Sequence, residues 1–302
     1  MVDLAPEILE CLTRAGRIAA DARERGARLI RAGAKVREVC QAVDEMIHEA
    51  GAAPAFPCQS SRNEVAAHYC PSPEDETTYA DGDLAKLDVG VHVDGWVVDT
   101  ALTVNVGGRA ENEPYVDAAR EALAAAIARL RPGLAVRELA RAIEAAVAGF
   151  GLRPMRNLSG HGVGRFTVHC PPPIPNVPDH DGGHRLAAGS VFAIEPFATD
   201  GMGLVSEQGP PEVFRLDPLR DRGGLPGDPA VLAAMRAFRG LPFARRQLAA
   251  LPRPRVEETL GALLKRGTLH GYPPLAESTG RRVAQAEHTV YLSPDGPVVL
   301  TQ

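Results

Sequence analysis

The residues best suited to chemistry are acids set in apolar, strand-like sequence. Asp88 and Asp99 lie in the segment KLDVGVHVDGWVVDTALTV, whose Asp94-Gly95 pair is typical of a two-residue hairpin turn. A turn at that pair places Gly90 opposite Asp99, so Asp88 shares the face of Asp99 as a diagonal neighbour roughly 7–8 Å away. Burying two carboxylates together raises the pKa of one of them strongly unless a cation neutralises the pair. The hairpin alone fits a metal site and a solvated sheet face about equally well.

Two further acids and one histidine extend this set. Glu195 ends the apolar run SVFAIEPF, and Glu287 lies in the strand-like run RRVAQAEHTVYL, on one face with Val283 and Tyr291. An isolated carboxylate in an apolar strand is costly to bury, so each acid is expected to have a partner. His161 lies in a predicted glycine turn, SGHGVG, where the glycines permit close backbone approach. Each acid could pair with an arginine, but the four acids and the histidine together favour one shared site.

An internal repeat indicates which elements position these residues. Residues 31–54 align with residues 131–154 at an offset of 100 without a gap, and eight of 24 positions are identical. Each copy predicts an amphipathic helix that ends at a glycine, and a further helix precedes each copy, at about 6–30 and 114–130. Strand-like sequence follows each copy. The chain is therefore predicted to be α+β, with two related halves whose helices pack on one side of a mainly antiparallel sheet.

The stretch 208–272 departs from the repeat and is predicted to be a helical insertion within a single domain, 1–302. Short helices are expected in it near 228–239, 243–250 and 254–266, and strand-like sequence returns at 282–292.

Composition places the chain of 302 residues among ordinary globular proteins, with 45% hydrophobic and 24% charged residues. The net charge of −5 disfavours a generally basic nucleic-acid binder. Five cysteines without a CxxC pair disfavour a disulfide framework and a cysteine-ligated zinc site, and they favour a reducing cytosol. The sequence has no signal-peptide pattern and no apolar run of membrane-spanning length, so a cytoplasmic protein is expected. No phosphate-binding glycine motif supports a nucleotide-binding protein.

Five motifs in order resemble the methionine aminopeptidases of the pita-bread fold: AFPCQSSRNEVAAHYCPSP, KLDVGVHVDGWVVDT, SGHGVGRFTVHCPPPIPN, IEPFAT and QAEHTVYL. They cover nearly the whole chain, from Phe56 to Leu292. The resemblance implies a pseudo-two-fold, duplicated antiparallel sheet with outer helices, in agreement with the repeat. The long insertion between Glu195 and Glu287, without a long charged N-terminal extension, resembles the compact, archaeal-style type II branch.

The resemblance implies a hydrolase that removes the N-terminal methionine from nascent proteins and peptides. It implies two divalent metal ions per chain (Co, Mn, Fe, Zn or Ni), with a metal-bridging water as nucleophile. Asp88 would chelate one metal, Asp99 and Glu287 would bridge both, and the other metal would be completed by His161 and Glu195. A set of four carboxylates and one imidazole suits these metals and argues against copper. The free α-amine of the substrate would bind a metal, which would confine cleavage to the N-terminus.

The resemblance also implies roles for residues that hold no metal. His68 would stabilise the oxyanion or assist the leaving group, and His169 would contact the scissile amide or the following residue. Glu195 would shuttle a proton while remaining a ligand. The methionine side chain is expected in a snug apolar pocket. Three aromatic residues are candidates for this pocket: Phe56, Phe197 and Tyr272. Two cysteines are less usual for the family, and the sequence leaves open whether they touch the metal site: Cys70 and Cys170.

Two other readings stay open. A prolidase or aminopeptidase P would share the fold and the five ligands, but AAHY and the long insertion favour the methionine-specific branch. A non-catalytic relative could act as a ribosome- or RNA-associated module through arginines of the insertion, although such a relative is expected to have lost ligands. The arginines are Arg236, Arg239, Arg245, Arg246, Arg253, Arg255 and Arg266. A monomer is expected, with transient ribosome contact, no specific nucleic acid and no membrane.

Overall fold

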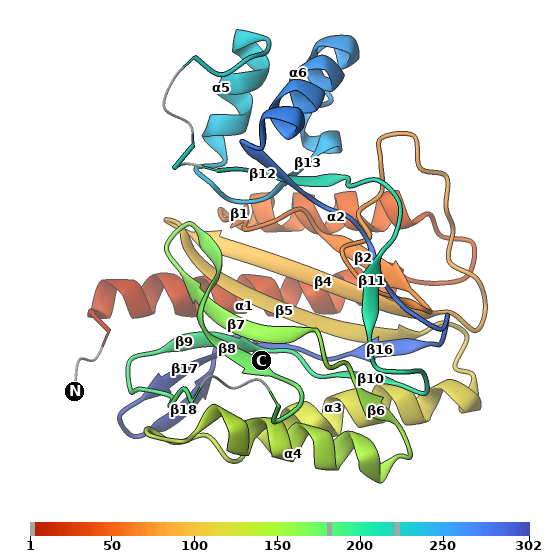
Figure 1. The fold of residues 1–302 in the computed structure, drawn as a ribbon, viewed down its shortest axis with the longest axis vertical. Coiled ribbons are helices and arrows are strands. Elements are labelled where there is room, and N and C mark those ends of the chain that lie inside the picture. Colours follow the sequence, from red (N-terminus) through yellow and green to blue (C-terminus); the bar gives the residue numbers. More distant parts are fainter. Residues whose placement is uncertain (1–3, 180–182, 218, 221–223) are drawn as a thin grey trace.

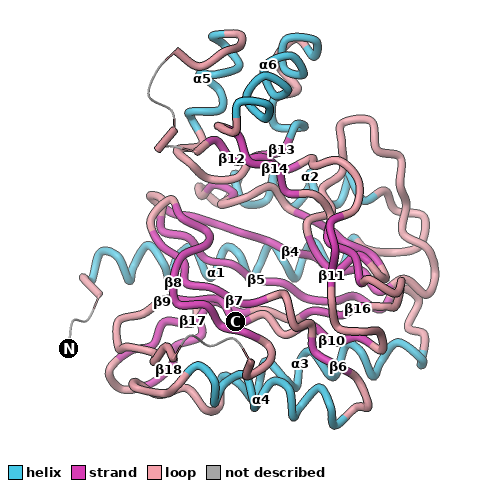
Figure 2. Tube along the Cα trace, in the orientation of Figure 1, coloured by secondary structure: helices cyan, strands magenta, loops and turns pink. Residues whose placement is uncertain are grey.

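Helices surround a set of antiparallel sheets (Figure 1). The structure, a computed structural model, describes residues 4–179, 183–217, 219–220 and 224–302. Figure 2 shows the strands gathered in the middle of the molecule and the long helices outside them. The α+β class predicted from the sequence is therefore confirmed. Every helix in the described ranges is too short or too polar to cross a lipid bilayer.

The predicted hairpin forms the centre of the fold. Strand β4 (Leu84–Val93) pairs with β5 (Trp96–Asn105) along its whole length, and Gly90 lies opposite Asp99. The two turn residues have φ angles of 51° and 87°, in the left-handed region that such a turn requires. The predicted register is confirmed, and Asp88 and Asp99 point to one face of the sheet.

Both halves of the chain use the same order of elements. The helices have these bounds: α1 Pro6–Leu29, α2 Val36–Glu49, α3 Glu113–Ile127 and α4 Val136–Gly149. Helices α2 and α4 lie 100 residues apart and have the same length of 14 residues. Each leads into a two-residue strand, β1 (Ala53–Pro54) or β6 (Arg153–Pro154). The sequence repeat is thus also a structural repeat.

Each half packs its helices into a separate hydrophobic cluster. The apolar stripe predicted for α2 is buried with residues of α1, β4 and β5. Residues of α3 and α4 are buried with the strands of the second half. The helices of each half therefore pack against the strands of that same half.

The second half contains a five-stranded sheet in the order β18-β17-β9-β7-β8. Its strands have these bounds: β7 Ser159–Gly164, β8 Thr167–Pro175, β9 Val191–Ile194, β17 His288–Ser293 and β18 Gly296–Val299. Beyond it, β10 (Phe197–Thr199) pairs with both β16 (Val283–Gln285) and β6.

The prediction of one continuous strand over 282–292 is wrong. The chain is interrupted between β16 and β17, and the facing chain is interrupted between β9 and β10. Pro196, in the second interruption, has no N–H to donate, so a regular ladder cannot continue through it. Ala286 instead donates its backbone N–H to the Pro196 carbonyl at 3.2 Å. Glu195 and Glu287 therefore lie at the two breaks, outside the strands.

Residues of the predicted insertion form a hydrophobic cluster of their own. The elements there have these bounds: β12 Val213–Leu216, α5 Pro229–Ala237, β13 Phe243–Ala244, η2 Arg245–Leu248, α6 Arg253–Arg266 and β14 Leu269–Tyr272. The short helical segment expected near 243–250 is present in part, as the 3₁₀ helix η2 after the two-residue strand β13. β13 pairs with β12 there, and a 3₁₀ helix follows because Gln247 accepts a hydrogen bond from the backbone of Ala244. The division of 1–302 into one domain with an insertion at 208–272 stays a prediction.

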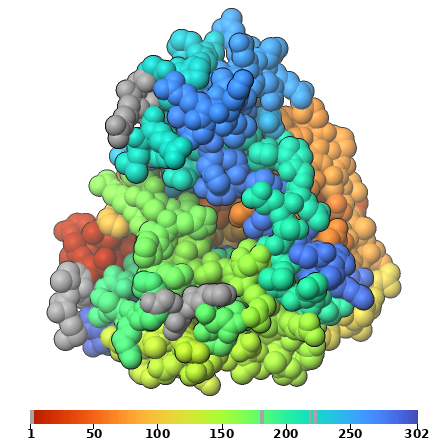
Figure 3. Space-filling model, in the orientation of Figure 1, coloured from red at the N-terminus to blue at the C-terminus, as the bar shows by residue number. Residues whose placement is uncertain are grey.

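The remaining elements are four short strands and one short 3₁₀ helix. They have these bounds: β2 Gln59–Arg62, β3 Val65–Ala67, η1 Ala110–Asn112, β11 Val205–Glu207 and β15 Leu275–Glu277. β2 pairs with β4, and β11, β15 and β3 form a small sheet. Figure 3 shows a hollow between the blue and cyan segment that carries α5 and α6 and the green second half.

Candidate metal centre

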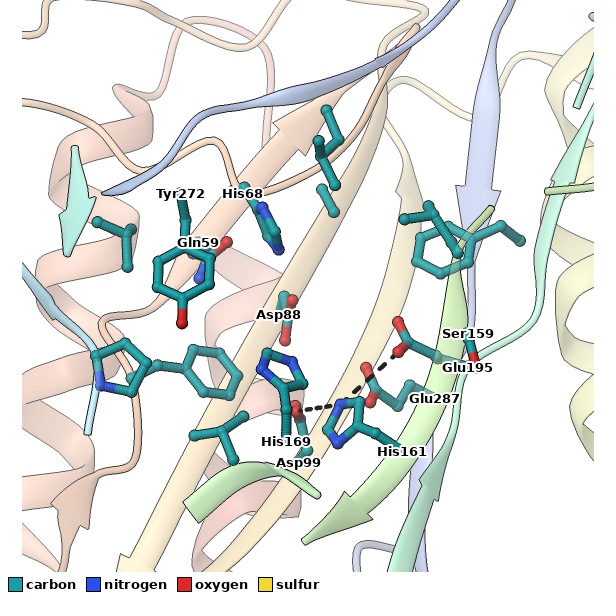
Figure 4. Close-up of a pocket in the computed structure, with 18 of the residues that line it drawn as sticks. Gln59, His68, Asp88, Asp99, Ser159, His161, His169, Glu195, Tyr272 and Glu287 are labelled. Carbon is teal, nitrogen blue, oxygen red and sulfur yellow. Dashed lines mark ion pairs between the residues drawn. The ribbon is translucent and has the colours of Figure 1, made fainter. Parts of the chain in front are cut away.

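All ten site residues predicted from the sequence line one cavity of about 320 Å³. They are Phe56, His68, Asp88, Asp99, His161, His169, Glu195, Phe197, Tyr272 and Glu287. Figure 4 shows the four acids and His161 turned toward a common centre, with His68 and Tyr272 above them.

The four acids of the site come from both halves of the chain. Asp88 and Asp99 come from the hairpin of the first half, whereas Glu195 and Glu287 come from the two breaks in the second. Continuing the register of the two flanking strand pairs across these breaks places Glu195 directly opposite Glu287. An isolated bridge from Ala101 to Glu287 joins the two sets.

His161 lies in strand β7, so its predicted placement in a glycine turn is wrong. The neighbouring glycines act differently: a Cβ on Gly160 would lie 2.4 Å from the Ala193 carbonyl oxygen. A Cβ on Gly162 would lie 2.2 Å from the Pro171 carbonyl oxygen. Only glycine lets the backbone approach this closely on both sides of the histidine.

The ring of His161 faces the carboxylates. Its Nε2 atom is 3.6 Å from Asp99 Oδ2 and 3.7 Å from Glu195 Oε1 (Figure 4). One ligand atom from each of Asp99, His161 and Glu287 lies within 4.8 Å of the other two. Burial, together with the nearby His169, lowers the pKa of His161 to about 3, so the imidazole is neutral and able to bind a metal.

The four carboxyl groups destabilise one another as anions. Burial raises the pKa of Asp88 to about 7. Burial and the charges of Asp88 and Glu195 raise the pKa of Asp99 well above its usual range. The pKa values of Glu195 and Glu287 rise for the same two reasons, burial first and neighbouring acids second. Four such groups stay ionised together only if positive charge lies between them.

Unpartnered oxygen atoms show that the site fits such a cation. Among the described residues, one buried oxygen of each of Asp88, Asp99 and Glu287 has no hydrogen-bond partner. Buried polar atoms are normally paired, and carboxylate oxygens with a neutral imidazole suit divalent first-row metals. The residues present therefore fit divalent metal binding.

His68 and His169 lie beside this cluster. Burial and the nearby His169 lower the pKa of His68 to about 4, and its backbone has a φ of 67°. Such a backbone is strained for a residue other than glycine and is typical of functional sites. His169 lies near the start of β8, its ring centroid 4.3 Å from that of His161. Desolvation and Arg215 also lower the pKa of His169.

The other wall of the cavity is apolar. The ring of Phe56 lies against Gly90, Phe197 is fully buried, and Tyr272 contacts His68 edge-on with ring centroids 5.7 Å apart. The sequence left open whether Cys70 and Cys170 touch the metal site. Neither thiol lines the cavity within the described residues.

Among the polar residues of the site that were missed from the sequence, Gln285 and Gln59 lie nearest to the acids in the strand register. Gln285 Nε2 lies 3.2 Å from Glu287 Oε2 and 3.5 Å from Glu195 Oε2. Gln59 lies opposite Asp88 in the register of β2 and β4 and lines the cavity. Strand alternation could have found Gln285, because it lies two residues before Glu287.

The fold and this centre together define a metallopeptidase. The model of the metallopeptidase family M24 matches residues 10–225. The chain belongs to this family, and it binds divalent metal as the family does.

Curated relatives are similar over nearly the whole chain. The chain is 43% identical to the methionine aminopeptidase of Thermococcus kodakarensis, over 97% of this chain and 99% of the relative. It is 41% identical to that of Methanothermobacter thermautotrophicus, over 98% of this chain and 99% of the relative.

Solved structures share the fold. The methionine aminopeptidase of Thermotoga maritima has a TM-score of 0.74 at 23% identity, with 100% of this chain and 99% of that chain covered. A prolidase of Pyrococcus furiosus has a TM-score of 0.63 at 20% identity, with 100% of this chain and 65% of that chain covered. The predicted pita-bread architecture is thereby confirmed.

Proposed function

We propose that this protein is a methionine aminopeptidase that hydrolyses the first peptide bond after an N-terminal methionine. The observation that carries the proposal is the meeting of four carboxylates and one neutral histidine beside an apolar cavity. The high identity to curated methionine aminopeptidases over almost the whole chain supports the same activity.

Two divalent metal ions would occupy the centre. Asp88 would chelate one ion, Asp99 and Glu287 would bridge both, and His161 and Glu195 would complete the other. The unpartnered oxygens of the acids support this assignment. When bound, the ions would lower the pKa of water and polarise the scissile carbonyl. The identity of the metals is part of the proposal: Co, Mn, Fe, Zn or Ni.

The neighbouring side chains would bind substrate and move protons. His68 is neutral at physiological pH and would donate a hydrogen bond to the developing oxyanion or to the leaving amide nitrogen. His169, beside it on the cavity wall, would contact the scissile amide. Glu195 would accept a proton from the attacking water and return it to the leaving amine.

The apolar wall would bind the methionine side chain. Phe56, Phe197 and Tyr272 all line the cavity, and the ring of Tyr272 meets that of His68 edge-on. A cavity of about 320 Å³ suits a single side chain with its adjoining peptide group. Bulky side chains at the first position are therefore expected to be rejected by lack of space.

Partners and setting are proposed on the same basis. The substrates would be nascent chains and peptides with N-terminal methionine, in the cytoplasm, acted on by a monomer in transient contact with ribosomes. The insertion gives little support to a broad nucleic-acid surface, because several of its arginines pair with acids. Examples are Arg253 with Glu74, Arg255 with Asp228, and Arg245 with Glu212 and Glu257.

One assay separates this function from its rivals. Metal-stripped protein would be reloaded with one metal at a time and offered a Met-Ala-Ser peptide, its acetylated form and an Ala-Pro peptide. We expect metal-restored release of free methionine from the unblocked Met peptide alone. Cleavage of only the Ala-Pro peptide would identify a prolidase-like enzyme. No cleavage of any peptide by metal-loaded protein would favour a non-catalytic relative.

A further inference from the structure

A polar network lies behind the candidate metal centre, on the side of helix α1. Neighbouring side chains of an extended chain point to opposite faces. Asp99 and Glu287 face the cavity, so the residues that follow them, Thr100 and His288, face away from it. Both meet the guanidinium group of Arg23, which comes from α1.

Arg23 is almost entirely buried, with 7% of its surface exposed. Its Nη1 atom donates to Thr100 Oγ1 and, at 3.2 Å, to the Thr301 carbonyl, and lies 3.4 Å from His288 Nδ1. Its Nη2 atom forms an ion pair with Glu24 at 3.1 Å. Within the described residues its Nε atom has no hydrogen-bond partner, so the contacts of Nη1 and Nη2 are the ones that offset the cost of burying the charge.

Thr100 connects Arg23 to Glu287, one of the two proposed bridging ligands. Its hydroxyl donates to the backbone carbonyl of Glu287 at 2.8 Å. A hydroxyl has one hydrogen to donate, and an arginine can only donate. Thr100 therefore accepts from Arg23 and uses its own hydrogen to donate to Glu287. The hydrogen bonds run from Arg23 through Thr100 to the Glu287 carbonyl.

A second path reaches the other proposed bridging ligand. The Thr289 hydroxyl accepts from the backbone N–H of Asp99 at 2.7 Å and donates to the Asp99 carbonyl at 2.8 Å. The backbone N–H of Thr289 donates to Thr301 Oγ1 at 3.1 Å. Since Arg23 contacts the Thr301 carbonyl, both paths converge on one side chain.

We propose that Arg23 is a positioning residue that acts through Thr100 to fix the spacing of Asp99 and Glu287, and this inference rests on the proposed function. A metal ion tolerates only small errors in ligand distance, about 0.2 Å. Asp99 lies in β5 of the first half and Glu287 lies just before β17 in the second, and an isolated bridge from Ala101 to Glu287 joins the two segments here. The network supplies a cross-link at this point.

The surroundings of Arg23 allow its polar contacts to be removed by substitution with little loss of packing. Arg23 and His288 line a cavity of about 940 Å³ between α1 and α3. Shortening or neutralising the side chain therefore removes polar contacts more than close packing. Valine has the shape of threonine without its hydroxyl, so T100V removes both the bond from Arg23 and the bond to Glu287.

The experiment measures Mn²⁺ binding by titration calorimetry, with thermal unfolding as a check of the fold. T100V and R23M are expected to weaken Mn²⁺ binding about 10–100-fold, as loss of a partner behind a metal ligand usually does. T100S, which keeps the hydroxyl, should restore the affinity. T259V is the matched control, because the buried Thr259 hydroxyl bonds to the backbone of Asp228 in the insertion, at 2.9 Å.

The outcomes separate this inference from the proposed function. If T100V and R23M bind Mn²⁺ as tightly as T259V does, the positioning role is overturned while the proposed function stands. If the unmodified protein neither binds Mn²⁺ nor releases methionine, the proposed function falls and the positioning role falls with it. Where R23M does not fold, the comparison of T100V with T100S decides the matter.

Discussion

Glu195 and Glu287 face each other where two paired strands are interrupted at the same level. The ladder between β9 and β17 and the ladder between β10 and β16 share one register, and the two acids occupy the gap. Strand alternation continues across this gap, so Glu287 lies on the same face as Gln285, which bonds to it. Each acid can therefore turn toward the centre while the flanking strands stay paired.

Replacing Glu287 by glutamine tests the proposed centre. E287Q keeps the volume but removes one charge, so we expect Mn²⁺ binding and kcat/KM for a Met peptide to fall by more than about 100-fold, which exceeds the usual effect of a partner behind a ligand. The metal-free variant should also melt at a higher temperature than the metal-free unmodified protein, because one repulsive charge is gone. Calorimetry and thermal unfolding measure both effects.

The control for E287Q is E138Q, at an exposed acid of α4 that pairs with Arg131 at 3.4 Å. It should bind Mn²⁺ and turn over substrate as the unmodified protein does. Tight Mn²⁺ binding by E287Q would remove Glu287 from the ligand set.

Replacing His68 should separate catalysis from metal binding. H68N is expected to lower kcat about 100-fold, the usual scale for loss of a proton-transfer or hydrogen-bonding group, with KM within a few-fold. Mn²⁺ affinity should not change, because His68 lies beside the acids and is not in the proposed ligand set. Steady-state kinetics and calorimetry check the two statements. A parallel loss of metal would make His68 a ligand instead.

Adding one methyl group at Gly90 should disturb the methionine pocket. A Cβ there would lie 2.2 Å from Cε1 of Phe56, so G90A must push the ring toward the cavity. We expect a loss of about 1–3 kcal/mol in unfolding free energy, typical of overpacking, and a raised KM for Met peptides. Urea unfolding and kinetics measure these changes.

G149A is the matched control for G90A, because nothing lies within 4 Å of a Cβ at Gly149. Its stability and KM should stay close to those of the unmodified protein. An unchanged KM in G90A would argue against Phe56 as part of the methionine pocket.

Local signals made the hairpin predictable, whereas pairing between distant segments did not. The Asp94-Gly95 turn sets the register of its own two strands, so the relation of Asp88 to Asp99 follows from nearby sequence. The break at Glu287 depends on Pro196, which lies far away in the chain. Nothing near Glu287 marks it.

Contacts between segments that are distant in the sequence also explain the other features that the sequence did not predict. In the segment 243–250, pairing of β13 with β12 overrides a helical pattern. Arg23 lies on the buried side of an amphipathic helix, where an arginine gives no sign of its distant partner Thr100. Cys70 packs against Arg246 of the insertion and not against the acids, a contact that only the folded chain creates.

Arg246 should be a major contact between the segment 208–272, the predicted insertion, and the first half. Its guanidinium pairs with Asp44 at 2.6 Å and donates to the Cys58 carbonyl at 3.0 Å, with 4% of the side chain exposed. R246M is expected to cost about 1–3 kcal/mol in unfolding free energy, because the half-buried Asp44 then loses its charged partner and keeps only the bond from the Cys58 backbone N–H. R246M combined with D44N should recover part of that loss, and urea unfolding measures both. Equal instability of the single and double variants would contradict this account.

Glu277 should make stability depend on acid pH. Burial alone raises its pKa, but hydrogen bonds from Thr279 and from the backbone of Arg281 and Met202 outweigh burial and lower the pKa below the ordinary 4.5. The carboxylate is thus more easily ionised in the folded state. Its contribution is complete above the ordinary carboxyl pKa and is lost as the pH falls below it.

E277Q should therefore be destabilised by about 2 kcal/mol at pH 7, since an amide cannot accept from all of these donors. The deficit relative to the unmodified protein should shrink as the pH falls below about 4. Urea unfolding at several pH values measures it. A deficit independent of pH would rule out the charge of Glu277 as its cause.

The origin of the ligands in both halves of the repeat bears on when the protein becomes active during its own synthesis. The proposed metal ligands run from Asp88 to Glu287, and the network behind them extends to Thr301. A ribosome that has translated the first half has made a hairpin with two acids but no centre. The proposed metal centre would thus be complete only late in translation, and a growing chain of this protein would gain its activity only after its second half has docked on the first.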